Sequence, residues 1–185
     1  LDAVIKPLNV TAKYVDRISK GDIPPKITDE YRGDFNEIKN NLNACIDAIG
    51  LLVQDANMLT QAAENGELST RADVSHHQGD FRKIVQGVNV TLDNVIGPLS
   101  VAAKYVDRIS KGDIPLKIVN DYRGDFNEIK NNLNTCIDAI NRLVQDAGML
   151  DKAAEEGKLD VRANATLHGG DFRRIIEGFN ETLNL

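Results

Sequence analysis

Two cysteines and three histidines are the residues of this sequence best suited to redox or transition-metal chemistry near neutral pH. Cys45 and Cys136 stand 91 residues apart on apolar positions of a helical pattern, where cysteine usually behaves as a small buried hydrophobe. His76, His77 and His168 lie in polar segments that offer no second ligand at a metal-binding spacing. We therefore expect buried, reduced thiols, solvated histidines, and neither metal nor cofactor.

A Gly-Asp-Phe element at residues 33–35 is a candidate anion-binding turn, because free amide groups at a helix start attract anions. Asp34 argues against a bound anion, since an aspartate at a helix start accepts those amide hydrogens as a cap. The sequence also lacks a Gly-rich strand-to-helix motif, a Ser/His/Asp set and an evident pair of catalytic carboxylates. We predict that the chain is not an enzyme.

The composition fits a folded, water-soluble chain with small aliphatic packing: 42% of the 185 residues are apolar, 27% are charged, 5% are aromatic and none is tryptophan. A net charge of −6 without a basic stripe argues against nucleic acid as a partner. No apolar run approaches the roughly 20 residues of a membrane span. No leader and no initiator methionine precede Leu1, so we expect a piece of a longer protein.

The sequence is an internal duplication. A shift of 91 residues aligns Pro7 with Pro98, and 60 of the 88 positions from Pro7 to Asn94 are then identical. A weaker period of 45 or 46 residues lies inside this duplication, because a Gly-acid-Ile/Leu or Gly-Lys-Leu element is followed 12 or 13 residues later by Gly-Asp-Phe. These elements define four repeats. The first glycines of the elements are Gly21, Gly66, Gly112 and Gly157.

Between these elements the apolar residues recur in alternating steps of three and four, which is the seam of a coiled coil or helical bundle. One unbroken seam runs from Phe35 to Ala63 and predicts a helix of roughly 30 residues that Gly66 ends. The same seam returns from Phe126 to Ala154. A second kind of seam, from Phe81 to Ile109, contains two successive steps of four.

That double step is a stutter, which locally unwinds a left-handed supercoil and changes the facing angle of the helix. Pro98 follows it closely, so we expect this helix to bend or break there. A long helix with so narrow a seam cannot bury it within a monomer unless the next helix folds back on it. The connectors are long enough to run back along a helix of about a dozen residues, which permits parallel helices. We predict an all-α fold in which a homodimer forms parallel four-helix bundles, stacked end to end through continuous helices.

With these features the whole chain resembles an array of HAMP domains, which are helix–connector–helix signal relays of roughly 50 residues. The resemblance implies four HAMP units, at residues 1–50, 51–97, 98–141 and 142–185. It implies signalling roles for a proline in the first helix, the glycine that ends it, two plug positions in the connector and an acidic residue at the start of the second helix. These positions are Pro7, Pro98, Gly21, Gly66, Gly112, Gly157, Ile23, Ile27, Leu68, Ile114, Ile118, Leu159, Asp34, Asp80, Asp125 and Asp171.

The chain departs from the family pattern in three ways. The usual Asp-Glu-x-Gly becomes Gly-Asp-Phe-Asn or Gly-Asp-Phe-Arg, so that the shorter aspartate makes the acidic contact. Units two and four carry Ala72 and Ala163 at the second plug position, and they lack the proline. The array therefore alternates two types of unit, which we call odd and even, and we expect looser connectors in the even units.

Segments such as Lys-Tyr-Val-Asp-Arg-Ile-Ser-Lys-Gly-Asp-Ile-Pro, at Lys13–Pro24, resemble tandem HAMP stretches of bacterial methyl-accepting chemotaxis proteins. The resemblance implies a cytoplasmic relay that passes helix rotation, tilt or repacking from a sensor to a chemotaxis-type output. Its partners would be a second copy of the chain, the input and output domains of the parent, and the chemotaxis kinase and adaptor. A sensor histidine kinase parent and a static coiled-coil spacer remain alternatives, and membrane anchoring of the parent stays open.

Overall fold

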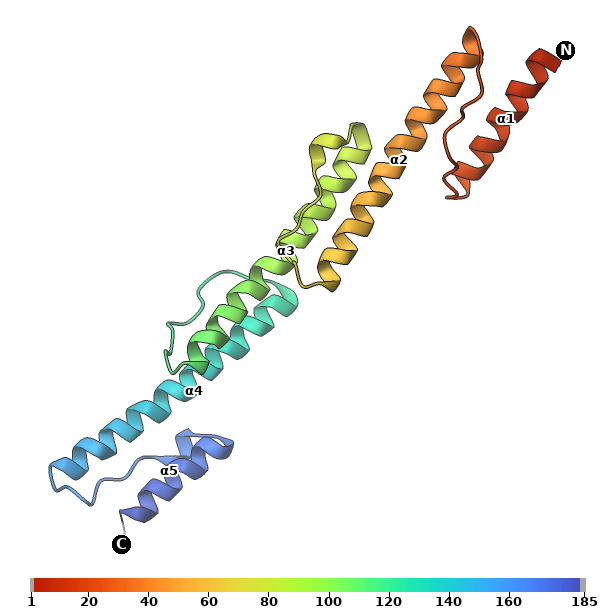
Figure 1. Ribbon diagram of the computed structural model, residues 1–185. Helices are drawn as coiled ribbons and strands as arrows, with labels where there is room; N and C mark the ends of the chain where they lie inside the picture. Colours follow the sequence, from red (N-terminus) through yellow and green to blue (C-terminus); the bar gives the residue numbers. More distant parts are fainter. Residues whose placement is uncertain (1, 184–185) are drawn as a thin grey trace. The chain divides into compact units, whose positions relative to one another are not determined.

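The computed structural model describes residues 2–183, and its regular elements are helices (Figure 1). No strand occurs within this range, so the predicted all-α class is confirmed. Two short 3-10 turns, η1 (Val74–His76) and η2 (Ala165–Leu167), lie in the connectors before the third and fifth helices. The α-helices are α1 (Asp2–Ser19), α2 (Asp34–Glu64), α3 (Gly79–Ser110), α4 (Gly124–Glu155) and α5 (Gly170–Thr182).

The long helices follow the apolar seams. The seam from Phe35 to Ala63 lies within α2, which has 31 residues, close to the predicted length. At the end of α2 the chain turns through Gly66, whose φ of 75° lies in the left-handed region that glycine adopts without strain. The amide of Glu67 donates to the carbonyl of Ala62 at 2.8 Å, which is the Schellman hydrogen bond that closes a helix.

Helix α3 runs through Pro98 without a break. Proline has no amide hydrogen, so the carbonyl of Asn94 loses its usual helical donor at this point. Of the two alternatives expected at Pro98, a bend or a break, the break is therefore wrong. Pro7 likewise lies inside α1.

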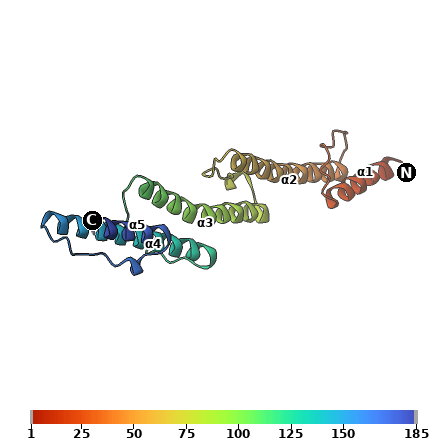
Figure 2. The ribbon, with the colours of Figure 1, turned by 90° about the horizontal axis from the view of Figure 1, so that it is seen from below.

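The chain divides into two compact halves, at Ile96 and Gly97. In the N-terminal half, α1 packs beside the first part of α2, and both helices run in the same direction (Figure 1). Figure 2 shows the connector between them projecting to one side of the helix pair. The second part of α2 and the first part of α3 repeat this arrangement, because residues of both helices line a common cavity. The connectors thus permit the parallel course that their length suggests.

The C-terminal half repeats the plan with the last part of α3, α4 and α5. Residues of α3 and the start of α4 line one small cavity, and α5 packs against the end of α4 and against η2. Its apolar core joins Leu150 of α4, Ala163 of the connector and Ile176 of α5. In both halves a helix pair and its connector therefore form the basic repeat, and α2 and α4 each serve two successive repeats.

Candidate functional site

The four predicted glycines after the first helix of each repeat share one geometry. Gly21, Gly66, Gly112 and Gly157 have φ values of 79°, 75°, 76° and 71°. In each case the next residue donates its amide to a carbonyl five residues back, at 2.8 to 3.0 Å. This Schellman closure sends the connector back along the helix it has just left.

In the odd connectors, the plug residues lie under the returning chain. Ile27 and Ile118 are buried, at 6% and 5% exposure, whereas Ile23 and Ile114 are half-buried. The fully buried residues beside the first plug are prolines, at positions 24 and 115. The odd connectors are therefore held by aliphatic side chains at their middle.

In the even connectors, the first plug is exposed. Leu68 and Leu159 are 47% and 57% exposed in the single chain, and buried alanines replace the isoleucines at the second plug. An alanine buries several fewer methylene groups than an isoleucine, and each is worth about 0.8 kcal/mol. The apolar hold on the even connectors is therefore weaker within one chain.

A half-buried asparagine in the second helix fixes each plug residue by its backbone. The side-chain amide of Asn43 accepts from the amide of Ile27 at 2.8 Å and donates to its carbonyl at 3.0 Å. The amide and the carbonyl of Ile27 are thereby both hydrogen-bonded where the connector packs against the helix. An unpaired polar group buried there would cost about 1–3 kcal/mol. The same paired contacts join Asn89 to Ala72, Asn134 to Ile118 and Asn180 to Ala163.

Ion pairs at the surface add a second link between connector and second helix. Lys26 pairs with Asp47 at 2.7 Å, and the duplicated Lys117 pairs with Asp138 at the same distance. In the second repeat, Arg71 instead pairs with Asp93 and donates to the carbonyls of Leu68 and Thr70. Exposed pairs of this kind contribute little stability, so the asparagine contacts and the buried side chains decide the connector's position.

The acidic residues at the start of α2, α4 and α5 do not cap these helices. In α2 the cap position is Gly33, and Asp34 already lies in the first turn, with no side-chain hydrogen bond at the cap. The prediction that Asp34 is a cap is therefore wrong. Asp125 and Asp171 also lie in the first turn of uncapped helices, where their charge favours the positive end of the helix dipole. Asp80 and Asp171 form exposed ion pairs with Lys83 and Arg174.

Two of the three histidines contradict the expectation of solvated side chains. His77 and His168 are buried, at 3% and 9% exposure, whereas His76 is exposed. The Nε2 atom of His77 lies 2.5 Å from Oδ2 of Asp55, and that of His168 lies 2.6 Å from Oδ2 of Asp146. Each aspartate belongs to the preceding helix, so these pairs join the end of an even connector to the first helix of its repeat.

Hydrogen bonds at the helix ends perturb three exposed carboxyl groups. The Arg17 guanidinium donates to both oxygens of Asp22 and lowers the pKa of that carboxyl, and Arg108 lowers the pKa of Asp113 in the same way. The hydrogen bond from Ser75 lowers the pKa of Asp73, whose side chain caps η1. These groups stay ionised at neutral pH and brace the two ends of the connectors.

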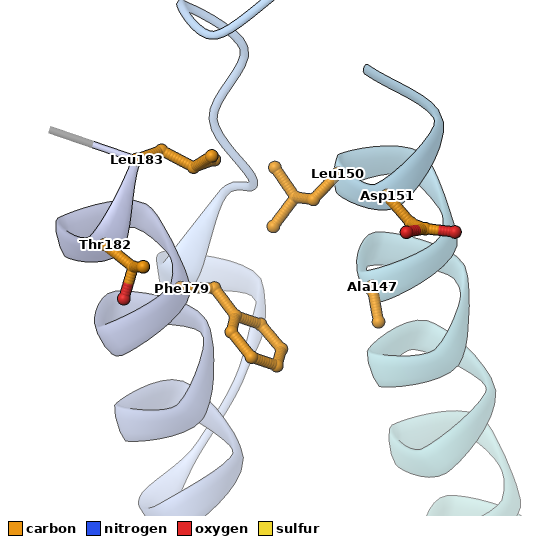
Figure 3. Close-up of a pocket in the computed structure, with 6 residues that line it drawn as sticks. All are labelled: Ala147, Leu150, Asp151, Phe179, Thr182 and Leu183. Atoms are coloured by element: carbon orange, nitrogen blue, oxygen red, sulfur yellow. The ribbon is translucent and has the colours of Figure 1, made fainter. Parts of the chain in front are cut away.

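The apolar seams themselves are incompletely covered. Cys45 is half-buried and Cys136 is exposed in the single chain, so the expectation of buried thiols is not met within one chain. Figure 3 shows the corresponding face in the last repeat, where Leu150 and Phe179 point from α4 and α5 into an open cavity of about 290 Å³. Several predicted seam residues of α3 are also left exposed, including Ile84, Val88, Val95, Leu99 and Val106.

The repeated helix pair, with a connector that runs back along it, defines a class of helical module built from parallel helices. The sequence profile described as HAMP domain matches residues 1–50 and 76–142, more than half of the chain. The chain therefore belongs to the HAMP domain family. Within the described residues no helix is long and apolar enough to cross a membrane.

One curated relative extends this assignment. The methyl-accepting chemotaxis protein McpB of Pseudomonas aeruginosa is 26% identical over 102 residues, which cover 55% of this chain and 15% of McpB. The match thus spans a small part of that protein. No solved structure matches the chain. The resemblance to the HAMP region of a chemotaxis protein is confirmed at this level.

Two sets of residues that hold the connectors were not predicted from the sequence, although both recur in it. The asparagines recur at intervals of 46, 45 and 46 residues, each following an apolar residue of the seam. His77 and His168 both stand 22 residues after an aspartate, and both are retained in the duplication while neighbouring residues differ. The asparagines recur in every repeat and the histidines recur in the 91-residue duplication. The fold is needed to show which residues they contact.

Proposed function

We propose that the chain is a signal relay that works as a parallel homodimer. The observation that carries the proposal is the exposed apolar seam on helices that already run parallel within one chain: Val88 and Leu99 of α3 are 41% and 42% exposed, at positions that face a partner in a coiled coil. A second copy would cover these residues and complete a four-helix bundle in each repeat. Pairing of this kind would remove the exposed apolar surface of these residues from water, which is favourable.

The relay proposal adds two packings of similar free energy in each bundle. A change of packing in one repeat would reach the next through α2 or α4, because each of these helices serves two repeats. The stutter and Pro98 in α3 support this proposal, since a helix that departs from the ideal period accepts more than one facing angle. The plug residues and the glycines that end the first helices would tune the balance between the two packings.

We further propose that the parent is a methyl-accepting chemotaxis protein, with this segment in the cytoplasm between an input domain and an output that controls a chemotaxis kinase through its adaptor. The similarity to part of McpB supports this placement. In this role the chain would transmit conformation without performing catalysis. The competing function is a static spacer, which would set a distance and carry no change of packing.

The deciding experiment replaces a buried plug in the parent protein and compares it with an exposed neighbour. Ile118→Ala removes a side chain that is 5% exposed, whereas Val119→Ala changes one that is 86% exposed. A relay predicts that Ile118→Ala shifts the kinase output in the absence of stimulus and that Val119→Ala does not. If Ile118→Ala lowers only the melting temperature and leaves both output and stimulus response unchanged, the chain is a spacer.

A further inference from the structure

The ends of the connectors differ between odd and even repeats at one position. Two residues before each Gly-Asp-Phe element, the odd repeats carry Tyr31 and Tyr122, which are half-buried. The even repeats carry His77 and His168 at this position, and each histidine side chain is only 1% exposed. The connector thus ends in an amphipathic ring in one repeat type and in a buried imidazole in the other.

The facing position on the first helix changes together with this residue. Eleven residues before the glycine that ends the first helix, the odd repeats carry Val10 and Val101, and the even repeats carry Asp55 and Asp146. Val101 and Tyr122 line one small apolar cavity in the third repeat. The valine and tyrosine that line one cavity in the third repeat therefore occupy the positions of the histidine–aspartate pairs, which measure 2.5 and 2.6 Å in the even repeats.

An additional residue in the even connectors delivers the histidine to this place. The spacing from the first glycine to the Gly-Asp-Phe element is 13 residues in the even repeats and 12 in the odd repeats. The longer segment folds into η1 or η2, directly before the histidine. The side chain of Asp73 or Asn164 accepts from the amide two residues on and starts the turn. The turn, the histidine and the aspartate thus form one unit in both even repeats.

Arginine side chains also hold the turn that carries each histidine. Asp55 contacts His77 from α2, while Arg82 of α3 donates to the carbonyl of His77 at 2.9 Å. Around His168, the guanidinium of Arg142 in α4 donates to the carbonyl of Leu167. The side-chain bond between histidine and aspartate therefore ties the imidazole to the first helix. In the fourth repeat Arg142 adds a tie from the same helix to the turn, whereas in the second repeat Arg82 holds the turn from α3.

We infer that His77 with Asp55, and His168 with Asp146, are latches that hold the end of the even connectors on the first helix. The even connectors need such a latch because their first plug is exposed and their second plug is an alanine. Breaking the bond leaves a buried imidazole without its partner, so the turn and the histidine leave the helix together rather than shifting gradually. The even repeats thereby possess a discrete open and closed connector that the odd repeats lack.

The latch follows from the contacts within one chain and does not depend on the dimer. Its consequence for signalling rests on the relay proposed above: an open even connector would free its bundle to repack, so that even repeats act as the adjustable members of the array. Amide hydrogen exchange measures the latch itself, and kinase output measures the consequence. The two measurements separate a failure of the latch from a failure of the relay.

Hydrogen exchange of the intact parent protein, read on peptides that cover residues 67–80 and 158–171, tests the latch. Asp55→Ala should accelerate exchange of the amides of Ser75, His76 and His77 by about tenfold to a hundredfold, because a charge-assisted hydrogen bond is lost. Peptide 158–171 retains its own pair and serves as the internal control. Substitution of the exposed neighbour, His76→Ala, should leave the exchange of peptide 67–80 within about threefold of the unmodified protein, since its ring contributes only a long exposed contact.

A second variant keeps the test decisive if the single change disturbs the fold. The double variant Asp55→Val with His77→Tyr installs the pair that the odd repeats carry, and it should restore slow exchange relative to Asp55→Val alone. Slow exchange in Asp55→Ala equal to that of the unmodified protein would overturn the latch. So would a double variant that exchanges as fast as Asp55→Val alone, since the two positions would then not act as a pair.

Discussion

At the scale of single residues, the asparagine beneath each connector is the contact with the clearest energetic consequence. Asn43→Ala would leave the buried amide and carbonyl of Ile27 without partners, because Asn43 satisfies both. We expect a loss of about 1–3 kcal/mol in the free energy of unfolding, measured by urea denaturation. Asn41→Ala, two residues earlier on the exposed side of α2, should change it by less than about 0.5 kcal/mol.

Equal losses of unfolding free energy for Asn43→Ala and Asn41→Ala would contradict this account. The hydrogen bonds from Asn43 to Ile27 would then contribute no measurable stability. The same comparison can be repeated with Asn134, whose contacts to Ile118 duplicate those of Asn43. The duplication thus supplies an independent replicate inside the same molecule.

The carboxyl groups at the helix ends predict a specific response to acid. The pKa of Asp22 is lowered because Arg17 donates to its carboxylate, and the pKa of Asp113 is lowered by Arg108. A lowered folded pKa contributes stability that is complete above the unfolded pKa of about 3.9 and is lost as the pH falls through the folded value. The double variant Asp22→Asn with Asp113→Asn should therefore lose less stability than the native chain between about pH 4 and pH 2.

Thermal unfolding of both proteins across that pH range checks the acid prediction. Parallel curves for the variant and the native chain would show that these two pairs do not contribute. Asp73, whose pKa is also lowered, remains in both proteins and keeps part of the slope in each.

At the scale of the helices and connectors, glycine has two opposite effects on stability, depending on whether it ends a helix or lies inside one. Gly66 ends α2 at a φ of 75°, a conformation that costs other residues about 1–2 kcal/mol, whereas Gly50 lies inside α2. Neither glycine has an atom within 4 Å of the position of an added Cβ. Gly66→Ala should therefore destabilise the protein by about 1 kcal/mol, and Gly50→Ala should stabilise it by about 0.5–1 kcal/mol.

Melting temperatures of the two glycine variants test this assignment. A stabilising Gly66→Ala would mean that the helix continues past Glu64 and that the Schellman closure does not form. The contrast is informative because both substitutions add the same methyl group and change the same helix.

The helices were predictable because their information is local. The seam from Phe35 to Ala63 and the glycine at position 66 suffice to define α2, since apolar spacing and left-handed glycine act within a few residues. The connectors were less predictable because their contacts span 16 to 25 residues. From the sequence alone, the polar segment that contains His77 is predicted to be solvated. The structure shows that His77 is instead bonded to Asp55 of the preceding helix.

The prediction that Asp34 caps α2 failed for a related reason. An aspartate before an apolar run usually indicates a cap, but Gly33 adopts a φ of 55° and takes the cap position itself. Asp34 is thereby displaced into the first turn. A backbone conformation available to glycine decided the position of the helix start, and residue preferences alone do not contain it.

At the scale of the whole molecule, the central claim is that two chains pair in parallel and in register along their seams. Cys45 lies on this seam in α2, and Cys136 occupies the duplicated position in α4. In a parallel pair, each thiol would face its twin across the axis, as residues at core positions of a coiled coil do. Neither thiol is buried in the single chain, so both are open to such pairing.

Mild oxidative crosslinking of these native cysteines, combined with the mass of the unoxidised protein from light scattering, tests the claim most directly. The account predicts a dimeric mass and rapid formation of symmetric disulfides, Cys45 to Cys45 or Cys136 to Cys136, identified by peptide mapping. A monomeric mass without crosslinks, or disulfides that join Cys45 to Cys136, would contradict parallel, in-register pairing and with it the proposed relay.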